Sequence, residues 1–131
     1  MYKQFTTTAF LMLLVVTGQA QPAGDVFTSE KGRFRVSYQS QLDPIAINRM
    51  HSWTLMVADS GGEPVTGANI AIKGGMPQHN HGLATQPTIE SSGEGTYLLQ
   101  GLRFHMMGYW ELELTIDDGS AKDTVMIPLE L

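Results

Sequence analysis

Hydrophobic and polar residues alternate along most of the chain, and no stretch of useful length has the 3.6-residue repeat of an amphipathic helix. The clearest alternation runs from Trp110 to Ile116, where every second residue is apolar and the residues between them are Glu or Thr. Such a strand buries one face against a core and exposes the other face to water. We therefore expect a protein built from β-strands.

Further alternating segments are separated by short runs of turn-forming residues. The strands expected from this pattern cover residues 33–38, 45–47, 53–57, 68–73, 88–91, 110–116 and 125–129. Pro44 places the second of these at a sheet edge, because proline cannot donate a hydrogen bond to a central ladder. Seven or eight short antiparallel strands in about a hundred residues predict an all-β, immunoglobulin-like sandwich, and Tyr97 stands where such folds place a tyrosine corner. The middle of the core is expected at Trp53, Trp110, Leu112 and Leu114.

The first 20 residues differ from the rest of the chain. Lys3 is their only charge, residues 10–16 are apolar, and small residues precede a cleavage point after Ala20. The apolar run is shorter than the roughly 20 residues that a membrane-spanning helix needs. We expect residues 1–20 to be a cleaved signal peptide and residues 21–131 to form one periplasmic or secreted domain. An uncleaved N-terminal anchor is the alternative.

Composition narrows the classes of function. The chain has 13 acidic and 8 basic residues, a formal net charge of -5, and this balance disfavours nucleic acid and anionic membranes as partners. It has no cysteine, which excludes disulfides and thiolate catalysis. It also lacks the Gly-x-Ser-x-Gly motif of serine hydrolases. We therefore expect a binding protein and not an enzyme.

The segment from Gly74 to Gly82 contains residues that a packed strand does not require. Two glycines, a proline and a third glycine bracket His79 and His81. In extended backbone, residues i and i+2 point to the same side with Cα atoms about 6.6 Å apart, so the two imidazoles can turn toward one point. Met76 can bring a thioether to the same edge.

A second group of donors, His105, Met106 and Met107, precedes the strand that starts near Trp110. If both groups close the same end of the sandwich, nitrogen and sulfur ligands gather there. Ligands of one metal ion must share one centre after modest rearrangement. We therefore expect the side chain of His79 or His81 within about 10 Å of this second group.

The type of ligand decides which metal is favoured. Neither residues 70–87 nor residues 99–110 contain Asp or Glu, so the oxygen ligands that Ca²⁺ and Mg²⁺ need are absent from both segments. Imidazole together with thioether favours copper. Zinc bound through the histidines alone is an alternative, although structural zinc sites usually draw on cysteine.

A reading without metal is also open. In that reading the histidines are solvated loop residues, and Met76 and Met106 fill gaps in the core. His51 is expected to make a structural hydrogen bond near a strand end and not to bind metal.

Four segments taken together resemble the YtkA-like domain, with a looser similarity to the FixH-type proteins of cytochrome oxidase assembly. The segments are His51-Ser52-Trp53, residues 61–68, residues 75–82 and residues 101–110. The similarity spans about residues 45 to 130. It implies a small envelope domain with an immunoglobulin-like fold and a role around copper. FixH-type proteins carry a membrane anchor, whereas this chain has the expected cleavable signal.

The sequence thus predicts an exported metal-binding protein, which holds copper for copper handling or copper-enzyme assembly. The expected ligands are Met76, His79, His81, His105, Met106 and Met107. The alternative is a metal-free binding or scaffold module of the cell envelope, which residues 59–68 favour because they are typical of adhesion-like sandwiches. The expected partners are a metal ion and another envelope protein, with no nucleic acid and no stable membrane insertion after signal cleavage.

Overall fold

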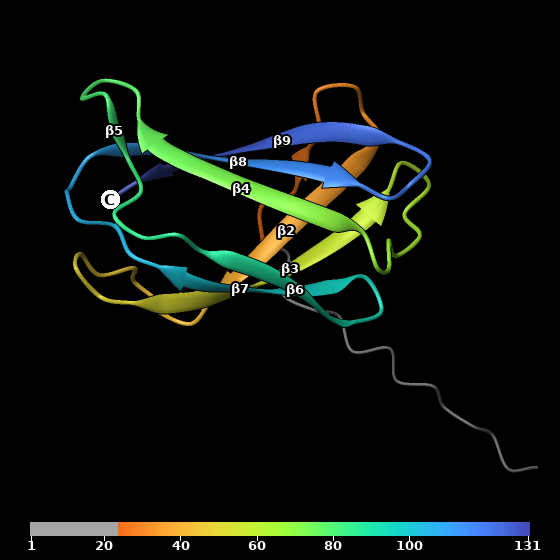
Figure 1. The fold of residues 1–131 in the computed structure, drawn as a ribbon, viewed down its shortest axis with the longest axis horizontal. Coiled ribbons are helices and arrows are strands. Elements are labelled where there is room, and N and C mark those ends of the chain that lie inside the picture. Colours follow the sequence, from red (N-terminus) through yellow and green to blue (C-terminus); the bar gives the residue numbers. More distant parts are fainter. Residues whose placement is uncertain (1–23) are drawn as a thin grey trace, which may run out of the picture.

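Two antiparallel sheets pack face to face in the structure, a computed structural model that describes residues 24–131 (Figure 1). The expected signal peptide lies outside the described residues. The first sheet contains, in spatial order, β1 (Phe27–Thr28), β2 (Phe34–Ser40), β3 (His51–Asp59), β7 (Thr96–Leu102) and β6 (Thr88–Gly93). The second contains β5 (His81–Gly82), β4 (Asn69–Met76), β8 (Tyr109–Asp117) and β9 (Lys122–Glu130). The predicted all-β sandwich is confirmed.

The core lies between the two sheets where the alternation places it. All four residues expected at its middle are fully buried, namely Trp53, Trp110, Leu112 and Leu114. Seven of the nine strands have six or more residues, and β1 and β5 have two each. In residues 24–131 we find no helix that is long and apolar enough to cross a membrane.

Three details of the predicted strands are wrong. Residues 45–47 form no strand, because they precede a left-handed residue, Asn48 (φ 59°), and Ile45 and Ile47 pack against the core from a loop. The sequence prediction contains no strand at residues 96–102, where β7 occupies the middle of the first sheet. The strand expected over residues 68–73 extends through Gly74 and Gly75 to Met76.

Tyr97 forms the tyrosine corner that the sequence indicates. Its hydroxyl donates a hydrogen bond of 2.6 Å to the carbonyl oxygen of Val65 and accepts one of 3.0 Å from the backbone N–H of Ala68. The side chain is buried, so both backbone groups find a partner away from water. The contact ties β7 of one sheet to the segment that leads into β4 of the other.

Several strand ends meet at one end of the sandwich, on the left in Figure 1. There β4 ends opposite the start of β8, since Gly75 pairs with Glu111. The start of β3 lies beside the end of β7, since His51 pairs with Leu102. We call this part of the molecule, residues 76–82 and 103–108, the histidine end. It contains every residue that the sequence predicts as a metal ligand.

Candidate metal site

The β4–β5 hairpin fixes the first group of donors. Met76 and His81 are directly paired across the two strands. Directly paired residues project to the same face of a sheet with Cβ atoms about 4.5 to 5.5 Å apart. The hairpin turns through residues 77–80, where the N–H of His79 donates to the carbonyl oxygen of Met76 at 3.1 Å and Asn80 is left-handed (φ 53°). The pairing therefore aims the His81 side chain to the same side as the buried Met76.

The glycines in this hairpin are needed for close backbone approach. A Cβ added at Gly75 would lie 2.6 Å from the carbonyl oxygen of His81, closer than real Cβ atoms come to a neighbour outside their own segment. A Cβ added at Gly74 would lie 2.8 Å from Leu83 Cγ, and the Leu83 N–H donates to the Gly74 carbonyl oxygen at 3.1 Å. The returning arm of the hairpin thus packs directly on the backbone of β4. This packing sets the position of His81.

The loop between β7 and β8, residues 103–108, fixes the second group. The indole Nε1–H of Trp110 donates to the carbonyl oxygen of Met106 at 3.0 Å. Gly108 exchanges two backbone hydrogen bonds with Leu131, of 2.8 and 3.0 Å, and the Asn48 N–H donates to the carbonyl oxygen of Phe104 at 2.8 Å. The loop is therefore held along its length, and His105 occupies a defined position within it.

Three imidazoles from these two segments form a row. The ring centroids of His79 and His81 lie 6.2 Å apart with nearly parallel planes, and those of His81 and His105 lie 5.7 Å apart, edge to face. The ring of His105 also meets the ring of Trp110 edge to face at 5.4 Å. The two groups of donors thus lie within the distance expected from the sequence. Their role as metal ligands stays a prediction.

One buried nitrogen in this row has no hydrogen-bond partner. Nδ1 of His105 is buried and makes no hydrogen bond within the described residues. Leaving a buried polar atom unpaired costs about 1 to 3 kcal/mol. Nε2 of His51 in the core is buried and unpaired in the same way, so it is the position of His105 beside His81, and not the unpaired nitrogen alone, that fits a metal-binding role.

The three predicted methionine ligands occupy different environments. Met76 is 1% exposed and lies in the core, with its Cε 3.1 Å from the place that a Cβ on Gly108 would take. Met106 is partly buried against the core, and Met107 is 68% exposed. Only Met76 is placed by strand pairing beside a histidine of the row. The six predicted ligands therefore do not all converge on one point.

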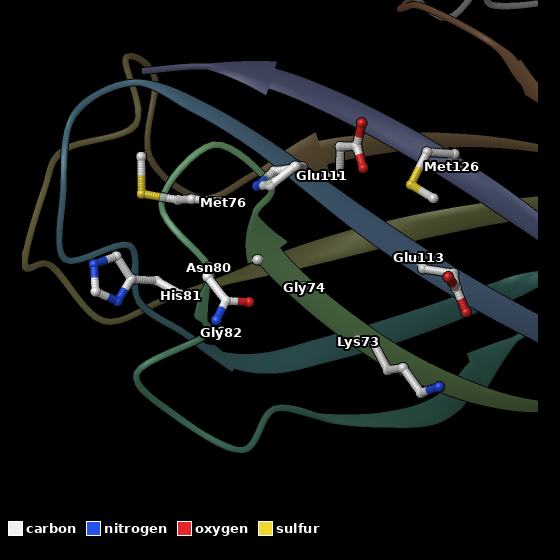
Figure 2. Close-up of a pocket in the computed structure, with 11 residues that line it drawn as sticks. Lys73, Gly74, Met76, Asn80, His81, Gly82, Glu111, Glu113 and Met126 are labelled. Atoms are coloured by element: carbon white, nitrogen blue, oxygen red, sulfur yellow. The ribbon is translucent and has the colours of Figure 1, made fainter.

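The described part of the chain contains no group of three His, Cys, Asp or Glu side chains close enough to hold a metal ion as they stand. A shared ion therefore requires the side chains of the row to turn their ring nitrogens toward one point. Figure 2 shows Met76 and His81 extending to one side of the hairpin, toward the loop that leads into β8.

A groove of about 320 Å³ lies beside the hairpin on the outer face of the second sheet, and Met76 and His81 are among the residues that line it (Figure 2). Glu111 and Glu113 of β8 and Lys73 of β4 line it. The hydroxyl of Tyr109 donates to Glu111 Oε1 at 3.0 Å, and this bond raises the pKa of Tyr109 above its usual value. Sequence reasoning missed the groove, because only the register of β4 and β8 shows that these charges flank the histidine hairpin.

His51 makes the structural contact expected of it. It is buried, and its Nδ1 donates to the carbonyl oxygen of Arg49 at 3.0 Å. Its ring centroid lies 5.8 Å from that of Phe104 and 6.4 Å from that of Trp53. The imidazole is thus part of an aromatic cluster inside the core and stands apart from the row formed by the other three histidines.

Comparison with known proteins gives one match. The family model described as YtkA-like matches residues 28–115, from the end of β1 into β8. This range starts before the segment expected from the sequence, about residues 45 to 130, and ends before β9. No curated protein and no solved structure matches the chain.

Proposed function

We propose that this protein, which belongs to the YtkA-like family, is an exported copper-binding protein with its copper site at the histidine end. The observation that carries the proposal is the approach of His81 and His105, whose ring centroids lie 5.7 Å apart although the two residues are 24 positions apart in the chain. Packing alone does not require an imidazole from strand β5 and one from the loop before β8 to meet at the end of a sandwich. The unpaired Nδ1 of His105 supports the same reading.

Each donor has a distinct role in this proposal. His81 and His105 supply the two primary imidazole nitrogens, and His79 supplies a third after a small change in the turn. Met76 lies on the same face as His81 and offers a buried thioether. A set of two or three imidazoles with one thioether suits copper in either oxidation state, since imidazole binds both and methionine favours Cu(I). Copper supplies no catalytic step here, because the proposed activity is binding and transfer.

The proposed setting is the periplasm or the outside of the cell, where the protein handles copper or helps to assemble a copper enzyme. The apolar segment at residues 10–16, followed by small residues up to Ala20, supports export. The absence of cysteine from the sequence suits an oxidising compartment, where thiol ligands are lost to disulfides. Histidine and methionine keep their metal-binding capacity under those conditions.

A competition titration of the protein against a chromophoric Cu(I) chelator tests this proposal. We expect one copper ion to bind per chain and its affinity to fall between about pH 7 and about pH 5, because a ligating imidazole must be neutral and free imidazole has a pKa of about 6.5. Thioethers do not titrate in this range, so the binding that persists in acid measures the contribution of methionine. Weak copper binding that is equal at both pH values would favour the metal-free scaffold module instead.

A further inference from the structure

Met107 has the most exposed large hydrophobic side chain in the part of the chain that the structure describes. It is 68% exposed, compared with 61% for Val26, 59% for Met50 and 37% for Met126. Its neighbour Met106 is packed against the core, so the two adjacent thioethers occupy opposite environments. Burial in the core therefore does not account for a methionine at this position.

The exposure of Met107 is imposed by a well-anchored loop. On one side, the carbonyl oxygen of Met106 accepts the hydrogen bond from the Trp110 indole. On the other side, Gly108 pairs with Leu131 through two backbone hydrogen bonds. Gly108 is also left-handed (φ 122°) and lies against the Met76 side chain. Both neighbours of Met107 are thus fixed, and its side chain is held out from a rigid base two residues from His105.

A thioether in this position is suited to ligand exchange with Cu(I). Methionine sulfur is a soft, uncharged ligand that prefers Cu(I), and it has no proton to lose on binding. His105 precedes Met107 by two residues in the same loop, the ring of His81 lies 5.7 Å from that of His105, and the Met76 side chain is buried. The histidine end therefore combines an exposed thioether at Met107, the neighbouring imidazoles of His81 and His105, and a buried thioether at Met76.

We infer that Met107 captures Cu(I) from a partner that carries the ion on methionine ligands and passes it to His81 and His105. This inference rests on the proposed function. In the first step a bond forms between Met107 Sδ and Cu(I) while a bond to a sulfur of the carrier breaks. In the second step imidazole nitrogens of His105 and His81 bind the ion while its bonds to Met107 and to the remaining sulfurs of the carrier break. The ion stays Cu(I) throughout, and neither a proton nor an electron is transferred.

Stopped-flow mixing with a synthetic methionine-rich peptide loaded with Cu(I), without oxygen, tests the inference. The Trp110 ring lies 5.4 Å from the His105 ring, so tryptophan fluorescence reports the arrival of copper at the imidazoles. Met107→Leu keeps the size and apolar character of the side chain but removes its sulfur. We expect this change to slow transfer by about tenfold and to leave the equilibrium affinity for Cu(I) within about twofold of wild type, since exchange rate and affinity are separable.

Met126→Leu is the matched control. Met126 is an exposed methionine on the outer face of β9, and its replacement should change neither the transfer rate nor the affinity. The inference is wrong if Met107→Leu receives copper at the wild-type rate, if Met126→Leu slows transfer equally, or if Met107→Leu loses affinity in proportion to rate. Failure of the proposed function would give a different result. In that case the wild-type protein itself would not compete for Cu(I) in the equilibrium titration.

Discussion

Trp110→Ala is expected to lower the free energy of unfolding by about 3 to 5 kcal/mol, the range for deleting a large buried aromatic side chain. Trp110 is fully buried at the start of β8, and its ring meets Phe104 at 5.2 Å and His105 at 5.4 Å. The change leaves a cavity and also removes the hydrogen bond to Met106. Total stabilities of small domains are about 5 to 15 kcal/mol, so the loss is a large fraction of the whole.

Urea unfolding of the two proteins measures this loss directly. Glu113→Ala is a suitable control, because Glu113 lies on the same strand but faces the outer groove. Substitutions at such positions usually change stability by less than about 0.5 kcal/mol. Equal urea concentrations at the midpoint of unfolding for Trp110→Ala and wild type would show that the stability of the core does not depend on this face of β8.

The double change His81→Ala and His105→Ala is expected to lower the affinity for copper by more than about 100-fold. Replacing a residue that only supports a metal ligand already costs about 10- to 100-fold in affinity, and here two direct ligands are lost together. Competition titration against the same Cu(I) chelator measures the effect. Circular dichroism should show that the variant keeps its β-sheet content, since His81 lies in the exposed two-residue strand β5 and His105 lies in the loop before β8.

His79→Ala serves as the comparison for this double variant. Its ring lies beside that of His81 at 6.2 Å, but it stands at the outer end of the row in an exposed turn. We expect its replacement to weaken copper binding by less than the double change. A double variant that binds copper as tightly as wild type would remove His81 and His105 from the site.

The alternation of apolar and polar residues was sufficient to predict an all-β sandwich, because each sheet buries only one face. It failed where the local pattern is interrupted. In β7 two consecutive leucines, Leu98 and Leu99, obscure the period of two, and the left-handed Gly101 precedes the last inward residue, Leu102. At Ile45 and Ile47 the alternation is real, but a loop buries these side chains without pairing in a sheet.

The candidate site was predictable only where the spacing of residues along the chain is enough to place a donor. The spacing of His79 and His81 identified two donors on one segment, and the loop before Trp110 supplied His105. Which methionine lies beside them depends on strand register and burial, and neither can be obtained from residue types alone. The pairing of Met76 with His81 and the exposure of Met107 are consequences of the hairpin and of the anchored loop.

The central claim is that His81 and His105 bind one copper ion together. The most direct measurement is a titration with Cu(I), which is diamagnetic, followed by NMR of the imidazole nitrogens and methionine methyl groups. The account predicts that signals of His81, His105 and the Met76 methyl group shift together and reach their limit at one equivalent, while the buried His51 ring stays unchanged. Shifts confined to His79 or to His51, with His81 and His105 unaffected at saturation, would contradict it.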